Sequence, residues 1–145
     1  MIKKIALLSF IALPLLAALP VPLEGWSIFG KVKFKEQYFK EQDEYYLVPF
    51  FDTKIQSYVG KEITLTGFYI PFEIPDKKTI IISKTPNSEC FFCGGSGPET
   101  VAEVKLLVNP PRLKADQTIT VVGKLKLNDK DVTHMNFILE QATLK

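Results

Sequence analysis

One short segment of this 145-residue chain carries residues whose types and spacing suit chemistry. Cys90 and Cys93 stand three positions apart and are followed at once by Gly94 and Gly95. Two thiolates at this spacing can bind one metal ion, and a glycine after the second cysteine supplies the positive φ that such a turn needs. The segment therefore indicates a metal-binding turn, with zinc or another transition metal as its ion.

Two other interpretations of the cysteine pair stay open. In an oxidising compartment, Cys90 and Cys93 can close a structural disulfide that stiffens the loop. The same spacing also occurs in thiol–disulfide redox proteins, where the first cysteine normally stands at the N-terminus of a helix. Here residues 94–98 read Gly-Gly-Ser-Gly-Pro, which disfavours a helix. The redox interpretation is therefore the least favoured of the three.

A tetrahedral zinc site needs four ligands, and the cysteine pair supplies two of them. Candidates for the remaining positions are Glu99 in the same segment and His134, the one histidine of the chain, with Glu89 or water as further alternatives. A lone histidine in a polar loop is more often an exposed bystander, but loops at one end of a barrel can converge on a common site. The predicted metal ligands are Cys90, Cys93, His134 and Glu99.

Other catalytic chemistry is not indicated. The chain contains no nucleophile elbow, no phosphate-binding loop and no paired carboxylates at a defined spacing. Asp129 and Asp131 precede His134, but aspartates in such turns commonly bond their own backbone. We therefore expect no enzyme, apart from the thiol redox alternative. The net charge of +2 offers little attraction for phosphates, so no nucleic-acid partner is expected.

The N-terminal residues are predicted to be a targeting segment. Lys3 and Lys4 precede nineteen residues without a charge, 5–23, which is the pattern of a secretory signal. Residues 1–24 are expected to be a cleaved signal peptide or an N-terminal membrane anchor, with a buried core segment as the third alternative. Both leading alternatives predict an exported protein in the periplasm, in the second case tethered to the inner membrane by residues 5–23.

Residues 25–145 are predicted to form a single β-rich domain. Strands are expected where β-branched and aromatic residues concentrate between turn signals, at 61–72, 78–83, 101–108, 118–127 and 136–144. A short helix capped by Asp52 and ended by Gly60 precedes them. Gly67 and Gly123, inside two strands, indicate bends that curl a sheet. The predicted fold is all-β with minor α, a small five-stranded OB-like (oligonucleotide/oligosaccharide-binding) barrel; a β-sandwich is the alternative.

An aromatic-rich segment lies ahead of that helix, at residues 25–51. It is interpreted as an apolar lid over the barrel followed by an edge strand at 45–51, with a polar loop at 35–43. A stacking surface for a ligand or single-stranded nucleic acid is the less favoured alternative.

Three segments, 60–71, 90–99 and 122–134, resemble an uncharacterised family of exported bacterial OB-fold-like proteins, a domain of unknown function. The resemblance spans about residues 26–145, and the Cys-Phe-Phe-Cys-Gly-Gly loop is its most specific part. The broader domain more often has a single cysteine followed by prolines. Its relatives tend to be encoded near transporters thought to handle metals, including zinc, so the resemblance implies metal handling.

These features predict a monomeric cell-envelope protein that binds a transition metal as an accessory of an envelope transport system. Its expected partner is an envelope transporter or another envelope protein. The alternative is a non-catalytic interaction module, in which a Cys90–Cys93 disulfide stiffens the loop and the aromatic N-terminal segment docks a partner. A thiol–disulfide redox protein is the third interpretation.

Overall fold

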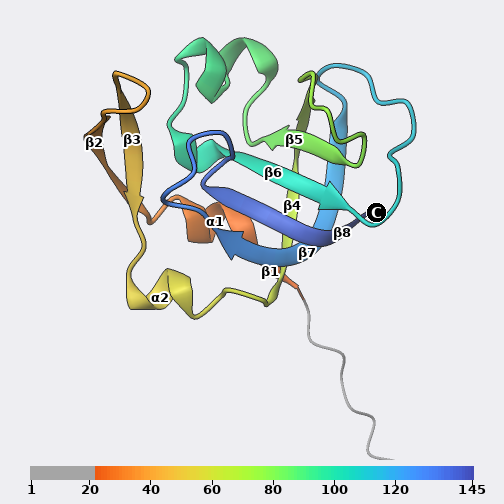
Figure 1. Cartoon of the computed structure of the whole chain (residues 1–145). Coiled ribbons are helices and arrows are strands. Elements are labelled where there is room, and N and C mark those ends of the chain that lie inside the picture. The colour runs from red at the N-terminus through yellow and green to blue at the C-terminus, as the bar shows by residue number, and fades with distance from the viewer. Residues whose placement is uncertain (1–21) are drawn as a thin grey trace, which may run out of the picture.

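The computed structural model describes residues 22–145 (Figure 1). The predicted signal peptide or anchor therefore lies almost entirely outside the described residues. Within residues 22–145, no helix combines the length and the apolar character that crossing a bilayer requires.

Five strands of the described chain close into a barrel (Figure 1). They are β4 (Glu62–Ile70), β5 (Thr79–Ser83), β6 (Val101–Leu106), β7 (Thr118–Leu127) and β8 (Phe137–Leu144). Their order is β4-β5-β6-β8-β7, and β7 pairs with β4 to complete the ring. Neighbours run antiparallel except β6 and β8, which are parallel. The predicted OB-like barrel and its five strands are confirmed, and the β-sandwich alternative is excluded.

Two glycines allow the barrel to curl as predicted. Strand β4 pairs with β7 from Glu62 to Phe68 and with β5 from Phe68 to Ile70, so it changes neighbours beside Gly67. A Cβ atom at Gly67 would collide with the carbonyl oxygen of Ser83. Gly123 lies at a register shift between β7 and β8, where a Cβ atom would come within 2.8 Å of Ala142. Both positions therefore need a residue without a side chain.

A short helix that the sequence pattern did not predict packs into the barrel core. Helix α1 (Gly25–Phe29) is capped by the carboxylate of Glu24, which accepts from the first backbone N–H groups. Phe29 is fully buried and stacks on Phe137, with ring centroids 4.1 Å apart. The indole of Trp26 donates to the carbonyl of Thr66 at 2.9 Å. The apolar lid expected from Trp26 and Phe29 is thus provided by this helix.

The rest of the aromatic-rich segment forms a hairpin beside the barrel (Figure 1). Strands β2 (Lys33–Phe39) and β3 (Glu44–Phe50) make a separate two-stranded antiparallel sheet. The predicted loop at 35–43 is therefore wrong, since its first half is strand. Most of β2 is exposed, so its sequence shows no alternation between a buried and a solvent face. Cross-strand contacts such as Tyr38–Tyr45 stabilise the strand instead. The predicted helix is confirmed as the shorter α2 (Thr53–Gln56), capped by Asp52.

Strand β5 is buried on both faces, and its outer face forms part of the candidate site. Ile80 and Ile82 point into the barrel core, while Ile81 belongs to a second, outer cluster with Ile70 and Cys90. Ile81 is also the register partner of Glu103 on β6. Cys90 therefore packs on the outer face of β5, and the carboxylate of Glu103 is buried beside it on the outer face of β6.

Candidate functional site

The connection between β5 and β6, residues 84–100, is called here the cysteine loop. It contains three 3-10 turns, η1 (Asn87–Glu89), η2 (Phe91–Cys93) and η3 (Pro98–Thr100). Cys90 immediately precedes η2 and Cys93 ends it. Gly94 follows with φ +75°, so the positive φ predicted after the second cysteine is confirmed.

The two thiols differ in environment. Cys90 is fully buried in the outer cluster, whereas Cys93 is exposed, and both are free thiols. The Cys93 thiol donates to the carbonyl of Asn87 at 3.1 Å. Desolvation, followed by charge and hydrogen bonding with the neighbouring Cys90 thiol, raises the pKa of the Cys93 thiol above its ordinary value of 9.0. The exposed thiol of the pair is therefore the one whose proton is held more tightly than in a free cysteine.

The cysteine loop is held mainly by hydrogen bonds among its own residues. The carbonyl of Glu89 accepts from the hydroxyl of Ser96 at 2.7 Å and from that of Thr85 at 3.1 Å. Gly95 donates its N–H to the carbonyl of Cys90 at 3.3 Å. These contacts join the two ends of the turn that carries the thiols. One longer-range bond, from the N–H of Asn87 to the carboxylate of Asp116 at 2.6 Å, ties the loop to the segment before β7.

Glu99, a predicted metal ligand, lies on η3 with its carboxylate against Gly97 of the same turn. His134 makes its contacts elsewhere, with Glu103. Across residues 22–145, no three His, Cys, Asp or Glu side chains are grouped so that they could hold a metal ion. The four predicted ligands are thus not assembled into one set in this structure.

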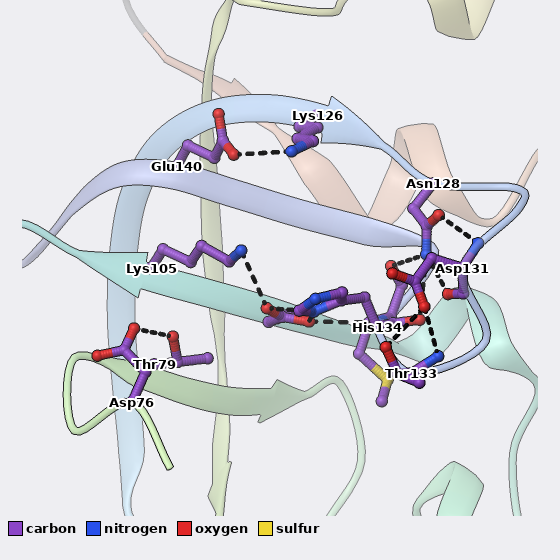
Figure 2. A network of polar contacts seen from close by, with 11 residues as sticks. Asp76, Thr79, Lys105, Lys126, Asn128, Asp131, Thr133, His134 and Glu140 are labelled. Carbon is purple, nitrogen blue, oxygen red and sulfur yellow. Dashed lines mark hydrogen bonds and ion pairs between the residues drawn. The ribbon is translucent and has the colours of Figure 1, made fainter. Parts of the chain in front are cut away.

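His134 instead belongs to a polar network on the outer face of the barrel (Figure 2). Its Nδ1 atom lies 2.9 and 3.0 Å from the two carboxylate oxygens of Glu103. The backbone N–H of Met135 donates to the same carboxylate at 3.3 Å, and the Nζ atom of Lys105 lies 3.6 Å away. The Glu103 side chain is 5% exposed and that of His134 42%. A buried carboxylate thus orients a half-exposed imidazole.

Glu103 was not predicted as a site residue, and the sequence offers a weak signal for it. On β6, Ala102 and Val104 face the core, so Glu103 is expected to point outward, where a carboxylate is usually solvated. Its burial comes from neighbouring segments rather than from its own strand. One of them is the connection between β7 and β8, residues 128–136, called here the histidine loop.

A groove of about 420 Å³ lies beside this network and is called here the outer groove. Strands β5 and β6 form its floor, while residues 71–78, which connect β4 to β5, and the histidine loop form its walls. Its lining residues include Phe72, Asp76, Ile81, Glu103, Lys105 and His134. In OB folds, ligands bind on the face of the second and third barrel strands between these two connections.

A second hollow, of about 460 Å³, separates the hairpin from the barrel. Tyr45 and Tyr46 of β3 line one side, and Phe91 and Phe92 of the cysteine loop line another. His134 borders this hollow as well as the outer groove. The histidine loop therefore lies between the two concave surfaces.

Comparisons with known proteins give no match to this chain, whether with protein-family models, curated proteins or solved structures. The resemblance suggested by the cysteine segment therefore stays a prediction.

Proposed function

We propose that this protein is a cell-envelope protein that binds a thiophilic transition-metal ion through Cys90 and Cys93, with zinc as the first candidate. The observation that supports it is the turn itself. Two free thiols lie at either end of one tight turn that Gly94 closes with φ +75°. Thiolates are strong ligands for zinc, and this turn places both sulfur ligands within four consecutive residues.

Two thiolates fill half of a tetrahedral coordination sphere. In this proposal a partner's side chain, a small ligand or water fills the rest. An ion held in this way exchanges more readily than one held by four side chains. That behaviour suits an accessory of an envelope transport system, which must accept an ion and release it. The apolar residues 5–23 support an exported, periplasmic location.

The state of the Cys93 thiol favours metal binding over redox catalysis. A redox nucleophile needs a lowered pKa so that the thiolate is populated near neutral pH. The pKa of Cys93 is instead raised, first by desolvation and then by Cys90. A metal ion must displace the thiol protons as it binds, so zinc affinity should rise with pH.

Zinc titration of the full-length reduced protein against a chromophoric chelator tests this function. We expect about one zinc per chain and protection of both thiols from alkylation. Co²⁺ should give a thiolate charge-transfer band. Cys90→Ser and Cys93→Ser should each weaken zinc binding at least about tenfold, whereas Ser88→Ala, on an exposed position of the same loop, should leave it unchanged.

Unprotected thiols and no bound zinc at saturating concentration would contradict the metal function. Glu99→Gln and His134→Gln add a further distinction. If either also weakens binding about tenfold, the loop rearranges to bring that predicted ligand to the ion. If neither does, the cysteine pair acts without them.

The exposed hairpin favours a second candidate function, a non-catalytic interaction module. Tyr45 and Phe50 are each 67% exposed, and Leu47 between them is 42% exposed. Exposed aromatic residues of this kind are common in protein interfaces. A photo-crosslinker at position 45 in whole cells should then give a discrete product, also in the double cysteine-to-serine variant. The same crosslinker at position 41, in the hairpin turn, is the control, and equal labelling from both positions would contradict a docking role.

A further inference from the structure

The outer groove is built around an imidazole whose tautomer is set by its surroundings. Because Nδ1 of His134 faces both oxygens of Glu103, that nitrogen carries the proton. The other ring nitrogen, Nε2, has no hydrogen-bond partner among the described residues. With the side chain 42% exposed, Nε2 is available to a ligand as a hydrogen-bond acceptor while the ring is neutral.

Acceptors and donors line the groove beside this imidazole (Figure 2). The carboxylate of Asp76 accepts from the hydroxyl of Thr79 at 2.7 Å and from the N–H of Lys78 at 3.0 Å. The backbone bond from Lys78, followed by the Thr79 hydroxyl, lowers the pKa of Asp76, so the group is ionised at neutral pH. Lys105 adds an ammonium donor over the floor.

The rim of the groove presents an aromatic surface. Phe72 is 51% exposed, and its ring lies against that of Phe92 in the cysteine loop, with centroids 4.7 Å apart. This contact orients Phe72 at the mouth of the groove. A ligand in the groove therefore meets an apolar ring at the rim and polar groups at the floor.

We propose that the outer groove binds a neutral polyhydroxylated ligand, a short glycan, with Phe72 against the apolar face of one sugar ring. Sugar hydroxyls donate to Nε2 of His134 and to the carboxylate of Asp76, and they accept from Lys105. Phosphate-rich ligands are disfavoured because Glu73, Asp76 and Glu103 all line the groove. This binding uses none of the thiol chemistry of the cysteine loop.

Titration of the full-length protein with neutral trisaccharides tests the proposal, using chitotriose, cellotriose and maltotriose as probes. Amide NMR signals of residues 72–79 and 133–135 should shift and saturate at millimolar concentration for at least one of them. Phe72→Ala and His134→Gln should each weaken that binding about tenfold. Phe50→Ala, at an aromatic position of the hairpin that is 67% exposed, should leave it unchanged.

Thermal unfolding of each variant separates lost binding from lost structure, because Phe72 is half exposed and its removal should leave the fold intact. The double variant Cys90→Ser/Cys93→Ser should bind the glycan like the parent protein, so failure of the metal function leaves this proposal standing. No saturable shift with any of the three probes would overturn the proposal. Binding that Phe72→Ala and His134→Gln leave unchanged would overturn it as well.

Discussion

The cysteine loop and the histidine loop flank the same outer face of the barrel, yet their chemical groups are held in different ways. Most contacts that shape the cysteine loop join residues within a dozen positions, such as those to the carbonyl of Glu89. His134 instead depends on Glu103, which lies 31 positions away on a barrel strand. The thiols are positioned mainly by local turns, with Cys90 also packed on Ile70 and Ile81, whereas the imidazole is positioned by the tertiary fold.

This difference suits the two proposed roles. A metal turn must adjust as the ion and its other ligands arrive, and short-range turns leave it that freedom. A groove for a shaped ligand works best when its polar groups are fixed in advance. Glu103 provides that fixation because β5 and β8 pair with its strand on either side.

The largest effect is expected when the tertiary anchor is removed. Glu103→Ala should lower the free energy of unfolding by about 3 kcal/mol, because it leaves a cavity and an unpaired N–H at Met135. Glu140→Ala is the matched control, since that glutamate forms an exposed ion pair with Lys126. It should cost less than about 1 kcal/mol. Equal losses in urea denaturation would show that the Glu103–His134 pair is no anchor.

A smaller loss is expected when the cysteine loop is overpacked. A Cβ atom at Gly95 would lie 2.6 to 2.8 Å from backbone atoms of Glu89, so Gly95→Ala should cost about 2 kcal/mol. At Gly94 no atom lies within 4 Å of such a Cβ, and Gly94→Ala should cost about 1 kcal/mol for its positive φ alone. Urea denaturation of both variants measures the difference. The reverse order would refute this account of the turn.

The two thiols should differ in what they add to stability. Cys90→Ala removes a buried sulfur from the outer cluster and should cost about 1 kcal/mol. Cys93→Ala acts on an exposed side chain and should stay within about 0.5 kcal/mol of the parent. Thermal unfolding under reducing conditions, without metal, provides the measurement. A larger loss of stability for Cys93→Ala than for Cys90→Ala would mean that a cysteine sulfur stabilises the turn rather than the buried cluster.

The histidine loop should weaken in acid. The hydroxyl and then the N–H of Thr133 lower the pKa of Asp131 from its ordinary value of 3.8. A carboxyl with a lowered folded pKa adds stability above its unfolded pKa and loses it as the pH falls through the folded value. The parent should therefore lose stability relative to Asp131→Asn below about pH 4. Parallel pH profiles for the two proteins would rule this out.

The cysteine loop should respond at the opposite end of the pH scale, with the smallest effect. Because the pKa of Cys93 is raised in the folded state, its contribution is present below the unfolded pKa and disappears as the pH rises through the folded value. Stability relative to Cys93→Ser should decline above about pH 9. Chemical denaturation between pH 7 and pH 10 follows this decline. A constant difference over that range would contradict it.

The barrel strands could be predicted because each has a regular environment. The segment 118–127 alternates toward the core and matches β7 residue for residue. The cap at Asp52 and the positive φ at Gly94 were also predictable, since both depend on a few adjacent residues. Local rules therefore describe most of the barrel and the thiol turn.

Two features needed the tertiary structure. Strand β2 was predicted as loop in part because most of its residues are exposed and only Phe34 and Phe39 are partly buried. Glu103 was missed because it lies on the outward side of its strand and is covered by segments distant in sequence. His134 was consequently predicted to lie with Cys90, Cys93 and Glu99 in a metal site rather than against a carboxylate of a barrel strand.

The parallel pairing of β6 with β8 has a consequence for the order of folding. The contact between Glu103 and His134 needs the two strands to meet across a long connection, and such non-local pairings form slowly because the loop entropy is lost first. The turns of the cysteine loop can form on a much shorter timescale. The imidazole should therefore meet its carboxylate late in refolding, so the His134 NMR signal would report the moment at which β6 and β8 pair.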